Sequence, residues 1–290
     1  MLTLVQLAQQ RRRRPPPSLK QQYQQYIMQR IEGYKNSIPR EELLRLGDEA
    51  VAELDITIAG QFVLTEVLMQ DSVDRLIRKR LSLRSFRRWC QQYRTLRSAQ
   101  REPTHWGIDP RSPVVRLLPR VEPGDLALVI GAAAEAMAYL LAAHDAEVVF
   151  IAGDLFSVER VESRATGESL AYNFSAIVAR LGYWLPEFPN PASVIVLDSA
   201  VIESFGHQRR SQVLLQLQEL TLPGGAHLIV HGGHALAPDA FLSHYGNWSR
   251  EEMAREKRRE TNSSMGVLLS KPLSQTDALV YESKVHGRRA

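Results

Sequence analysis

Three histidines and one nearby carboxylate are the side chains of this sequence whose types could bind a metal ion. His227 and His231 flank the apolar stretch 228–230, His234 follows two glycines, and Asp239 comes shortly afterwards. A zinc site needs its ligands to converge on one point. These histidines instead stand at the two ends of a predicted strand and in the loop after it. That placement favours a polar loop at the carboxyl edge of a sheet over a metal site. We therefore expect no metal.

A second set, Asp198, Ser199 and His207, has the residue types of a hydrolase triad. A nucleophilic serine needs a tight strand-to-helix turn with flanking glycines, which exposes its hydroxyl oxygen. The sequence around Ser199 has no such glycines, so we exclude hydrolase chemistry. Cys90 is the only cysteine, which excludes an internal disulfide and a cysteine-based zinc site and suits a reducing, cytoplasmic setting.

The elements that must position these residues change in character along the chain. Residues 18–103 carry apolar side chains at three- and four-residue steps, which predicts a small all-helical domain of four helices. Residues 104–120 are predicted to be a connector, and residues 121–290 alternate strands with helices. Such alternation is typical of an α/β fold with a doubly wound, mostly parallel sheet. Strands are predicted at 126–131, 147–151, 192–197 and 226–230, and helices at 136–143, 156–170 and 208–220.

Residues 115–275 resemble the class I S-adenosylmethionine-dependent methyltransferases. The resemblance rests on Pro123-Gly124-Asp125 before the first strand, on Asp198 at the end of a later strand, and on the turn Leu222-Pro223-Gly224-Gly225 before another. Residues 245–250 and 265–271 fit the final antiparallel pair of that family. The resemblance implies a methyltransferase-like, Rossmann-like sheet and, for an active member, S-adenosylmethionine as the cofactor.

The resemblance also implies which residues would contact that cofactor: Gly131, Ala133, Asp154, Tyr183 and Asp198. The family has a Gly-x-Gly-like loop after the first strand, because side chains there would collide with the cofactor while backbone amides face it. Here the first glycine is kept as Gly131, but Ala133 stands in place of the second.

Two further positions depart from the family. The second strand normally ends in an acidic residue that binds both ribose hydroxyls. Here it ends at Ala152, and Asp154 either takes over that role or caps the next helix. Tyr183 stands where the family often has an acidic residue near the adenine, and no Asn/Asp-Pro-Pro-Tyr-type motif follows Asp198. We therefore predict a degenerate methyltransferase with no catalytic residue and no cofactor.

Positive charge is concentrated at the front of the chain. Residues 1–103 hold 19 basic and 11 acidic residues, whereas residues 104–290 hold 17 and 21. The aromatic residues Phe86, Trp89 and Tyr93 are interleaved with basic ones, and such a surface could bind an acidic protein, anionic lipid or nucleic acid. We predict a docking surface formed by a basic, proline-rich arm (residues 1–17) and part of the helical domain: Arg11, Arg12, Arg13, Arg14, Arg78, Lys79, Arg80, Arg84, Arg87 and Arg88.

Three functions are compatible with these residues. The favoured one is a non-catalytic, methyltransferase-like protein that serves as a peripheral accessory subunit of a larger assembly. The alternatives are an active S-adenosylmethionine-dependent methyltransferase and a nucleic-acid-binding protein. In overall appearance the chain is similar to a methyltransferase-like accessory subunit of a bacterial photosynthetic reaction-centre and light-harvesting complex, which implies other protein subunits as partners.

No segment predicts a transmembrane helix. The most apolar stretch, 126–143, contains Glu135 and a glycine turn, and it fits a strand, a loop and a helix better than a membrane span. We expect a cytoplasmic protein, or a peripheral one on the cytoplasmic face of the inner membrane.

Overall fold

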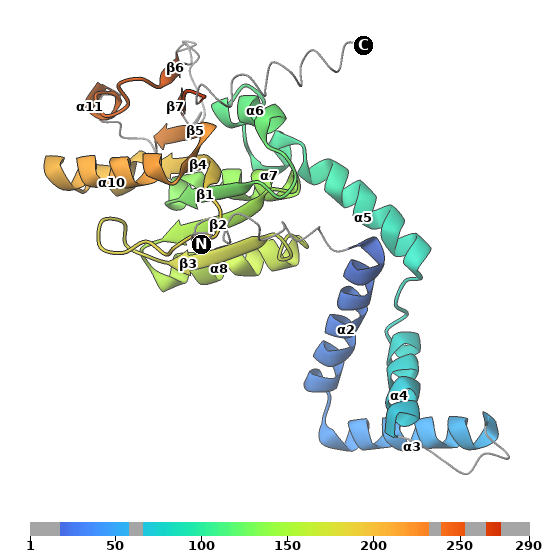
Figure 1. Ribbon diagram of the computed structural model, residues 1–290. Helices are drawn as coiled ribbons and strands as arrows, with labels where there is room; N and C mark the ends of the chain where they lie inside the picture. The colour runs from blue at the N-terminus through green and yellow to red at the C-terminus, as the bar shows by residue number, and fades with distance from the viewer. Residues whose placement is uncertain (1–17, 58–65, 232–238, 253–264, 274–290) are drawn as a thin grey trace, which may run out of the picture. The chain divides into compact units, whose positions relative to one another are not determined.

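The computed structural model describes residues 18–57, 66–231, 239–252 and 265–273 (Figure 1). The chain divides into a helical unit, which extends to Leu96, and an α/β unit, which begins at Arg97. Among the described residues, no helix combines the length and the apolar character needed to cross a membrane.

The border between the units falls within helix α5 (Phe86–Gln100), before the border predicted after residue 103. The last turn of α5 belongs to the α/β unit because its side chains are bonded there. The Arg97 guanidinium lies 3.0 Å from the Asp145 carboxylate, and Gln100 Nε2 donates a hydrogen bond to the Glu168 carbonyl oxygen at 2.7 Å.

The helical unit consists of α2 (Leu19–Ser37), α3 (Arg40–Thr57), α4 (Glu66–Arg80) and the first part of α5. Helix α2 begins with a capping box, in which Ser18 and Gln21 each accept a hydrogen bond from the backbone amide of the other. The apolar residues that predicted the helices form one buried cluster: Ile27, Ile31, Leu46, Ala50, Leu76 and Ile77. Four helices are thus present as predicted, although the predicted start of the third, at residue 61, lies outside the described residues.

The predicted connector contains three short helices. They are η1 (Pro103–Trp106), α6 (Pro113–Leu117) and η2 (Leu118–Arg120), and each has a proline at its first or second position. Trp106, Val114 and Leu117 are buried in the core of the α/β unit. This segment therefore packs as part of that unit.

The α/β unit is built on one seven-stranded sheet. Its strands are β1 (Leu126–Ile130), β2 (Glu147–Ala152), β3 (Phe174–Val178), β4 (Ala192–Asp198), β5 (Thr221–His231), β6 (Ser249–Glu252) and β7 (Met265–Ser270). They lie in the order β3-β2-β1-β4-β5-β7-β6. The first five are parallel, and β7 is antiparallel to both β5 and β6. This order confirms the predicted fold class: a doubly wound, mostly parallel, methyltransferase-like sheet that ends in an antiparallel pair.

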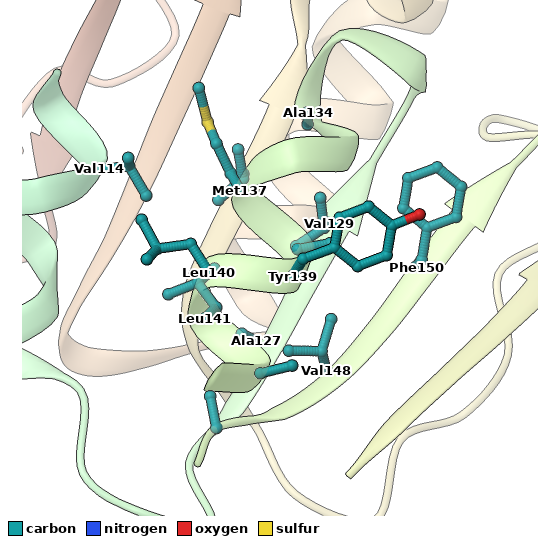
Figure 2. Packing of buried hydrophobic residues seen from close by; sticks show 14 of the residues in the cluster. Val114, Ala127, Val129, Ala134, Met137, Tyr139, Leu140, Leu141, Val148 and Phe150 are labelled. Carbon is teal, nitrogen blue, oxygen red and sulfur yellow. The ribbon is translucent and has the colours of Figure 1, made fainter. Parts of the chain in front are cut away.

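Helices cover both faces of the sheet. On one face, α7 (Glu135–Ala143), α8 (Leu155–Gly167) and α6 pack on alternate strand residues, and Figure 2 shows Tyr139 and Leu140 of α7 among Val129 and Phe150. On the other face, α9 (Ser199–Glu203), α10 (His207–Glu219) and α11 (Asp239–Leu242) pack on the intervening residues. Both faces are buried at the centre of the sheet, so β1 is one continuous apolar run.

Three details differ from the predictions, two in the sheet and one in a helix. The predicted turn at 222–225 lies inside β5, because the strand bulges there: Ala192 pairs with Thr221, but Val194 pairs with Ala226. The predicted strand at 245–250 begins only at Ser249, since Tyr245 is drawn into the core instead. Helix α8 also ends at Gly167, three residues before the predicted end.

Candidate functional site

Strands β1, β2 and β4 end side by side at the carboxyl edge of the sheet. Ile130 is paired with Ile151 of β2 on one side and with Leu197 of β4 on the other. Gly131 and Asp198 directly follow these paired residues, so the structure brings them together. In open α/β sheets this edge is where ligands bind.

The carboxylate of Asp198 is buried and fully engaged by backbone amides. Its Oδ2 atom accepts a hydrogen bond from the Ala133 amide at 3.0 Å, and its Oδ1 atom accepts one from the Ala200 amide at 3.0 Å. Only 6% of the residue is exposed. The second bond caps α9 at its first turn. The first bond occupies the loop amide that the resemblance to methyltransferases would direct toward a cofactor.

Gly131 is required by this packing. Its φ is +92° and its ψ is 159°, a combination that essentially only glycine adopts. A Cβ atom at this position would lie 2.5 Å from Asp198 Cβ and 2.8 Å from Val201 Cγ2. The fold itself therefore accounts for this glycine.

Asp154 is the N-cap of helix α8. Strand β2 ends at Ala152, and Asp154 Oδ1 accepts a hydrogen bond from the Ser157 amide at 2.8 Å. This backbone bond is the main reason that the pKa of the Asp154 carboxyl is lowered. Of the two roles considered for Asp154, the structure supports the helix cap.

Tyr183 lies on the surface at the exit of β3. Its side chain is 72% exposed, and the guanidinium carbon of Arg209 lies 4.1 Å from the centre of its ring. Arg209, from the first turns of α10, also closes over Gly182, whose φ is +79°. Tyr183 thus stacks on an arginine of its own chain.

Three positions that the resemblance assigns to the cofactor have another partner or lack the expected group. The loop amide of Ala133 is bonded to Asp198, strand β2 ends without a carboxylate, and Asp154 caps a helix. We derive no chemical step at this site.

His227 has a structural role that the sequence did not predict. It lies inside β5, is fully buried, and connects Thr221 to Tyr245. Thr221 Oγ1 donates to the Leu217 carbonyl oxygen at 2.7 Å, so it accepts from His227 Nε2 at 2.7 Å, which leaves Nδ1 to accept from the Tyr245 hydroxyl at 2.9 Å. Burial, and then the charge of Lys271, lower the pKa of His227 to about 3. The uncharged His227 side chain therefore links, through hydrogen bonds, the part of β5 beside its bulge to the segment before β6.

The described residues contain no cluster of three or more histidine, cysteine, aspartate or glutamate residues suited to a metal ion. His231 ends β5 and Asp239 begins α11, whereas His234 lies outside the described residues. His227 was predicted at one end of a strand, whereas it lies in the interior of β5.

The predicted docking residues of the helical unit lie around the link between α4 and α5. Arg78, Lys79 and Arg80 form the last turn of α4, and Arg87 and Arg88 lie in the first turn of α5. The link is tight, because Ser82 has a φ of +48° and the Leu83 amide bonds back to the Arg78 carbonyl oxygen at 3.0 Å. The two basic runs are thereby held close together. Arg11, Arg12, Arg13 and Arg14 lie outside the described residues.

These basic residues are not equivalent. Arg80 forms ion pairs with Glu49 at 2.6 Å and Glu42 at 3.6 Å, and Arg84 bonds to the Gln92 side chain. Among the described residues no ion pair is found for Arg78, Lys79, Arg87 or Arg88, all of which are exposed. Those four residues, together with Arg84, whose partner Gln92 is uncharged, carry positive charge that no described acidic residue neutralises.

The aromatic residues of this segment pack within the helical unit. The Trp89 ring stacks on Tyr93 at 4.9 Å between centroids and lies 5.5 Å from the Tyr23 ring of α2, and Phe86 meets Tyr23 edge-on at 5.3 Å. A surface that binds single-stranded nucleic acid needs aromatic faces open for base stacking. Trp89 and Phe86 thus share the Tyr23 ring as a packing partner, although 42% of Phe86 stays exposed.

Comparisons with solved structures found matches at low sequence identity. The N-methyltransferase NodS from Bradyrhizobium japonicum WM9 is similar at 16% identity, with 55% of this chain and 92% of that chain covered and a TM-score of 0.45. NodS in complex with S-adenosyl-l-homocysteine gives 15% identity, 62% and 98% coverage and a TM-score of 0.45. A SAM-dependent O-methyltransferase from Thermotoga maritima gives 14% identity, 56% and 64% coverage and a TM-score of 0.42. No protein-family model and no curated protein matches the sequence.

Proposed function

We propose that this chain is a non-catalytic, methyltransferase-like protein that acts as a peripheral accessory subunit of a larger protein assembly. The observation that carries the proposal is the hydrogen bond from the Ala133 amide to the buried Asp198 carboxylate. It gives the loop amide a partner inside the protein, while Asp154 is committed to its helix. The α/β unit then acts as a scaffold, and binding surfaces perform the function.

Free charge on the helical unit supports a docking role. Arg87 and Arg88 lie in the first turn of α5, which contains no acidic residue. Cations at a helix N-terminus oppose the helix dipole by a few tenths of a kcal/mol to about 1 kcal/mol each. The two arginines therefore destabilise the helix. Their attraction for the acidic surface of a partner would compensate for that loss of stability.

The partner is proposed to be another protein subunit. A bacterial photosynthetic reaction-centre complex is the assembly suggested by the overall appearance of the sequence. Affinity purification of the tagged chain from native membranes tests this proposal. Chlorophyll-binding subunits should co-purify with the wild-type protein and be lost from the Arg87→Glu, Arg88→Glu variant. Equal recovery with both proteins would exclude docking through α5.

An active S-adenosylmethionine-dependent methyltransferase is the alternative, and architecture alone favours it. Architecture does not decide activity, because the same fold carries many functions and only the site distinguishes them. Direct binding of the cofactor separates the two proposals.

A further inference from the structure

The α/β unit has a second surface that the proposed function does not use. Seven of its described large apolar side chains are exposed, and five of them lie at the exits of two neighbouring strands. Phe156 and Tyr183 are each 72% exposed, and Trp184 is 60% exposed. We call this set the carboxyl-edge patch: Leu155, Phe156, Val178, Tyr183 and Trp184. Exposed apolar side chains gathered in this way mark interaction sites, unlike single ones scattered over a surface.

The patch is held together by the sheet. Strands β2 and β3 lie side by side, with Ala152 paired to Val178 and the Ala179 amide bonded to the Ala152 carbonyl oxygen at 2.9 Å (Figure 1). Leu155 and Phe156 begin α8 after the cap that follows β2. After β3, the amides of Tyr183 and Trp184 both bond to the Arg180 carbonyl oxygen, at 3.1 and 3.2 Å. The two apolar pairs therefore follow the ends of two strands that are hydrogen-bonded neighbours.

Two arginines give the patch a charge. Arg209 stacks on Tyr183, and the Arg180 side chain lies beside Gly153, with its Cγ atom 3.9 Å from the position of a Cβ there. Within the described part of the chain neither Arg180 nor Arg209 forms an ion pair, whereas Arg160 at the rim is paired with Glu135 at 2.6 Å. A guanidinium that stacks on an aromatic ring keeps its N–H edge available for a carboxylate.

The form of the patch favours a protein partner. Small-molecule sites are hollows that bury most of the ligand, whereas the aromatic rings here are themselves mostly exposed. Nucleic acid is disfavoured because a phosphate backbone needs several cations along its length, whereas Arg160 at the rim is paired with Glu135 and only Arg180 and Arg209 of the described patch residues are left without an ion pair. Tyrosine, tryptophan and arginine are the residue types that contribute most to protein–protein binding.

We propose that the carboxyl-edge patch, with Arg180 and Arg209, binds an acidic peptide segment of a partner protein, whose apolar or aromatic side chains lie on Phe156, Tyr183 and Trp184. The carboxylates of that segment pair with the two arginines. This inference rests on the proposed accessory function, in which surfaces rather than a cofactor site do the work. It adds a second docking surface, on the α/β unit.

Selection from a random 12-residue peptide library displayed on phage, against the full-length chain, tests the proposal. Enriched peptides are synthesised with a fluorescent label, and their Kd is measured by fluorescence anisotropy. We expect peptides in which acidic residues stand next to aromatic residues or leucine. The Kd should weaken at least about tenfold in the Tyr183→Ser, Trp184→Ser variant and in the Arg180→Gln, Arg209→Gln variant. Leu215→Ser is the matched control, because Leu215 is 57% exposed on α10 outside the patch and its loss should leave the Kd unchanged.

Other results would overturn the proposal. These are enrichment of basic peptides, binding that both patch variants retain, or displacement of the peptide by S-adenosylhomocysteine or by single-stranded poly(U). Sedimentation velocity provides a further check. A dimer of the wild-type chain that the Tyr183→Ser, Trp184→Ser variant loses would identify a second copy as the occupant. Failure here is distinct from failure of the proposed function, because tight S-adenosylmethionine binding refutes the latter whether or not peptides bind.

Discussion

Asp198 ends strand β4, yet its Oδ2 atom accepts a hydrogen bond at 3.0 Å from the amide of Ala133, which follows strand β1 and is 65 residues away in sequence. The bond joins the two central strands of the sheet at their carboxyl ends. It also satisfies a backbone amide in the turn Ala132–Ala134, which lies between β1 and α7. The carboxylate is shared with the Ala200 amide, so one side chain fixes two loops.

Replacement of Asp198 by asparagine should destabilise the α/β unit. The carboxamide nitrogen would face one of the two amide donors, which leaves that buried donor without an acceptor and costs about 1–3 kcal/mol. Asp154→Asn is the matched control, because asparagine is an equally good N-cap and the change should stay within about 0.5 kcal/mol. The urea-unfolding midpoint, followed by near-ultraviolet circular dichroism, measures both. Equal effects of the two substitutions would contradict the assigned role of Asp198.

Replacement of Gly131 by alanine should also destabilise the unit, through strain and overlap rather than a lost bond. The backbone conformation there costs a side chain about 1–3 kcal/mol, and the new Cβ would overlap Asp198. Gly33→Ala is the control, because Gly33 lies inside α2 with nothing within 4 Å of a Cβ. That substitution should stabilise helix α2 by about 0.5–1 kcal/mol. A neutral Gly131→Ala would show that the loop packs differently.

His227 should make the stability depend on pH. Its pKa is about 3 in the folded protein against 6.5 for the free side chain, so at intermediate pH the unfolded chain binds a proton that the folded chain does not. Stability is therefore full above pH 6.5 and falls as the pH drops toward 3, by about 2 kcal/mol at pH 5. The His227→Gln variant should be less stable at pH 7.5 but should lose about 2 kcal/mol less than wild type between pH 7.5 and 5. Parallel losses in the two proteins would assign the pH dependence to other groups.

Charge reversal on α5 should separate binding from stability. The Arg87→Glu, Arg88→Glu variant should lose partner binding by at least about tenfold, yet the helix should gain about 0.3–1 kcal/mol per residue, because acidic side chains suit a helix N-terminus. Arg30→Glu, Arg45→Glu makes the same charge change at exposed positions of the same unit and should leave binding nearly unchanged. Arg80→Glu should lower stability more than binding, since Arg80 is already paired with Glu42 and Glu49. If binding were lost equally in all three variants, net charge alone would explain it.

Helices and strands whose apolar residues recur at a regular spacing could be predicted from the sequence. The apolar runs of β1 and β4 and the three- and four-residue spacing in α2 report burial directly, and the structure has these elements close to the predicted bounds. The bulge in β5 was not predicted, because Leu222-Pro223-Gly224-Gly225 reads as a turn unless the pairing of β4 is known. The residue pattern of one segment does not show in which register a neighbouring strand pairs with it.

The site was less predictable than the fold. The cap at Asp154 follows from a local signal, an acidic residue just before a helix. The bond from Ala133 to Asp198 and the tie from His227 to Tyr245 join residues that are distant in sequence, and no periodicity reveals such contacts. Gly131 was expected to make room for a cofactor, whereas the structure has Asp198 in contact with it.

Calorimetric titration of the purified full-length chain with S-adenosylmethionine and S-adenosylhomocysteine tests the central claim most directly. A loop amide already bonded to Asp198 and a β2 strand that ends without a carboxylate predict no measurable heat of binding up to millimolar cofactor. The Asp198→Asn variant should behave in the same way. Micromolar binding by the wild-type chain would contradict the account, because Asp198 would then have to release Ala133 and the protein would be a candidate methyltransferase.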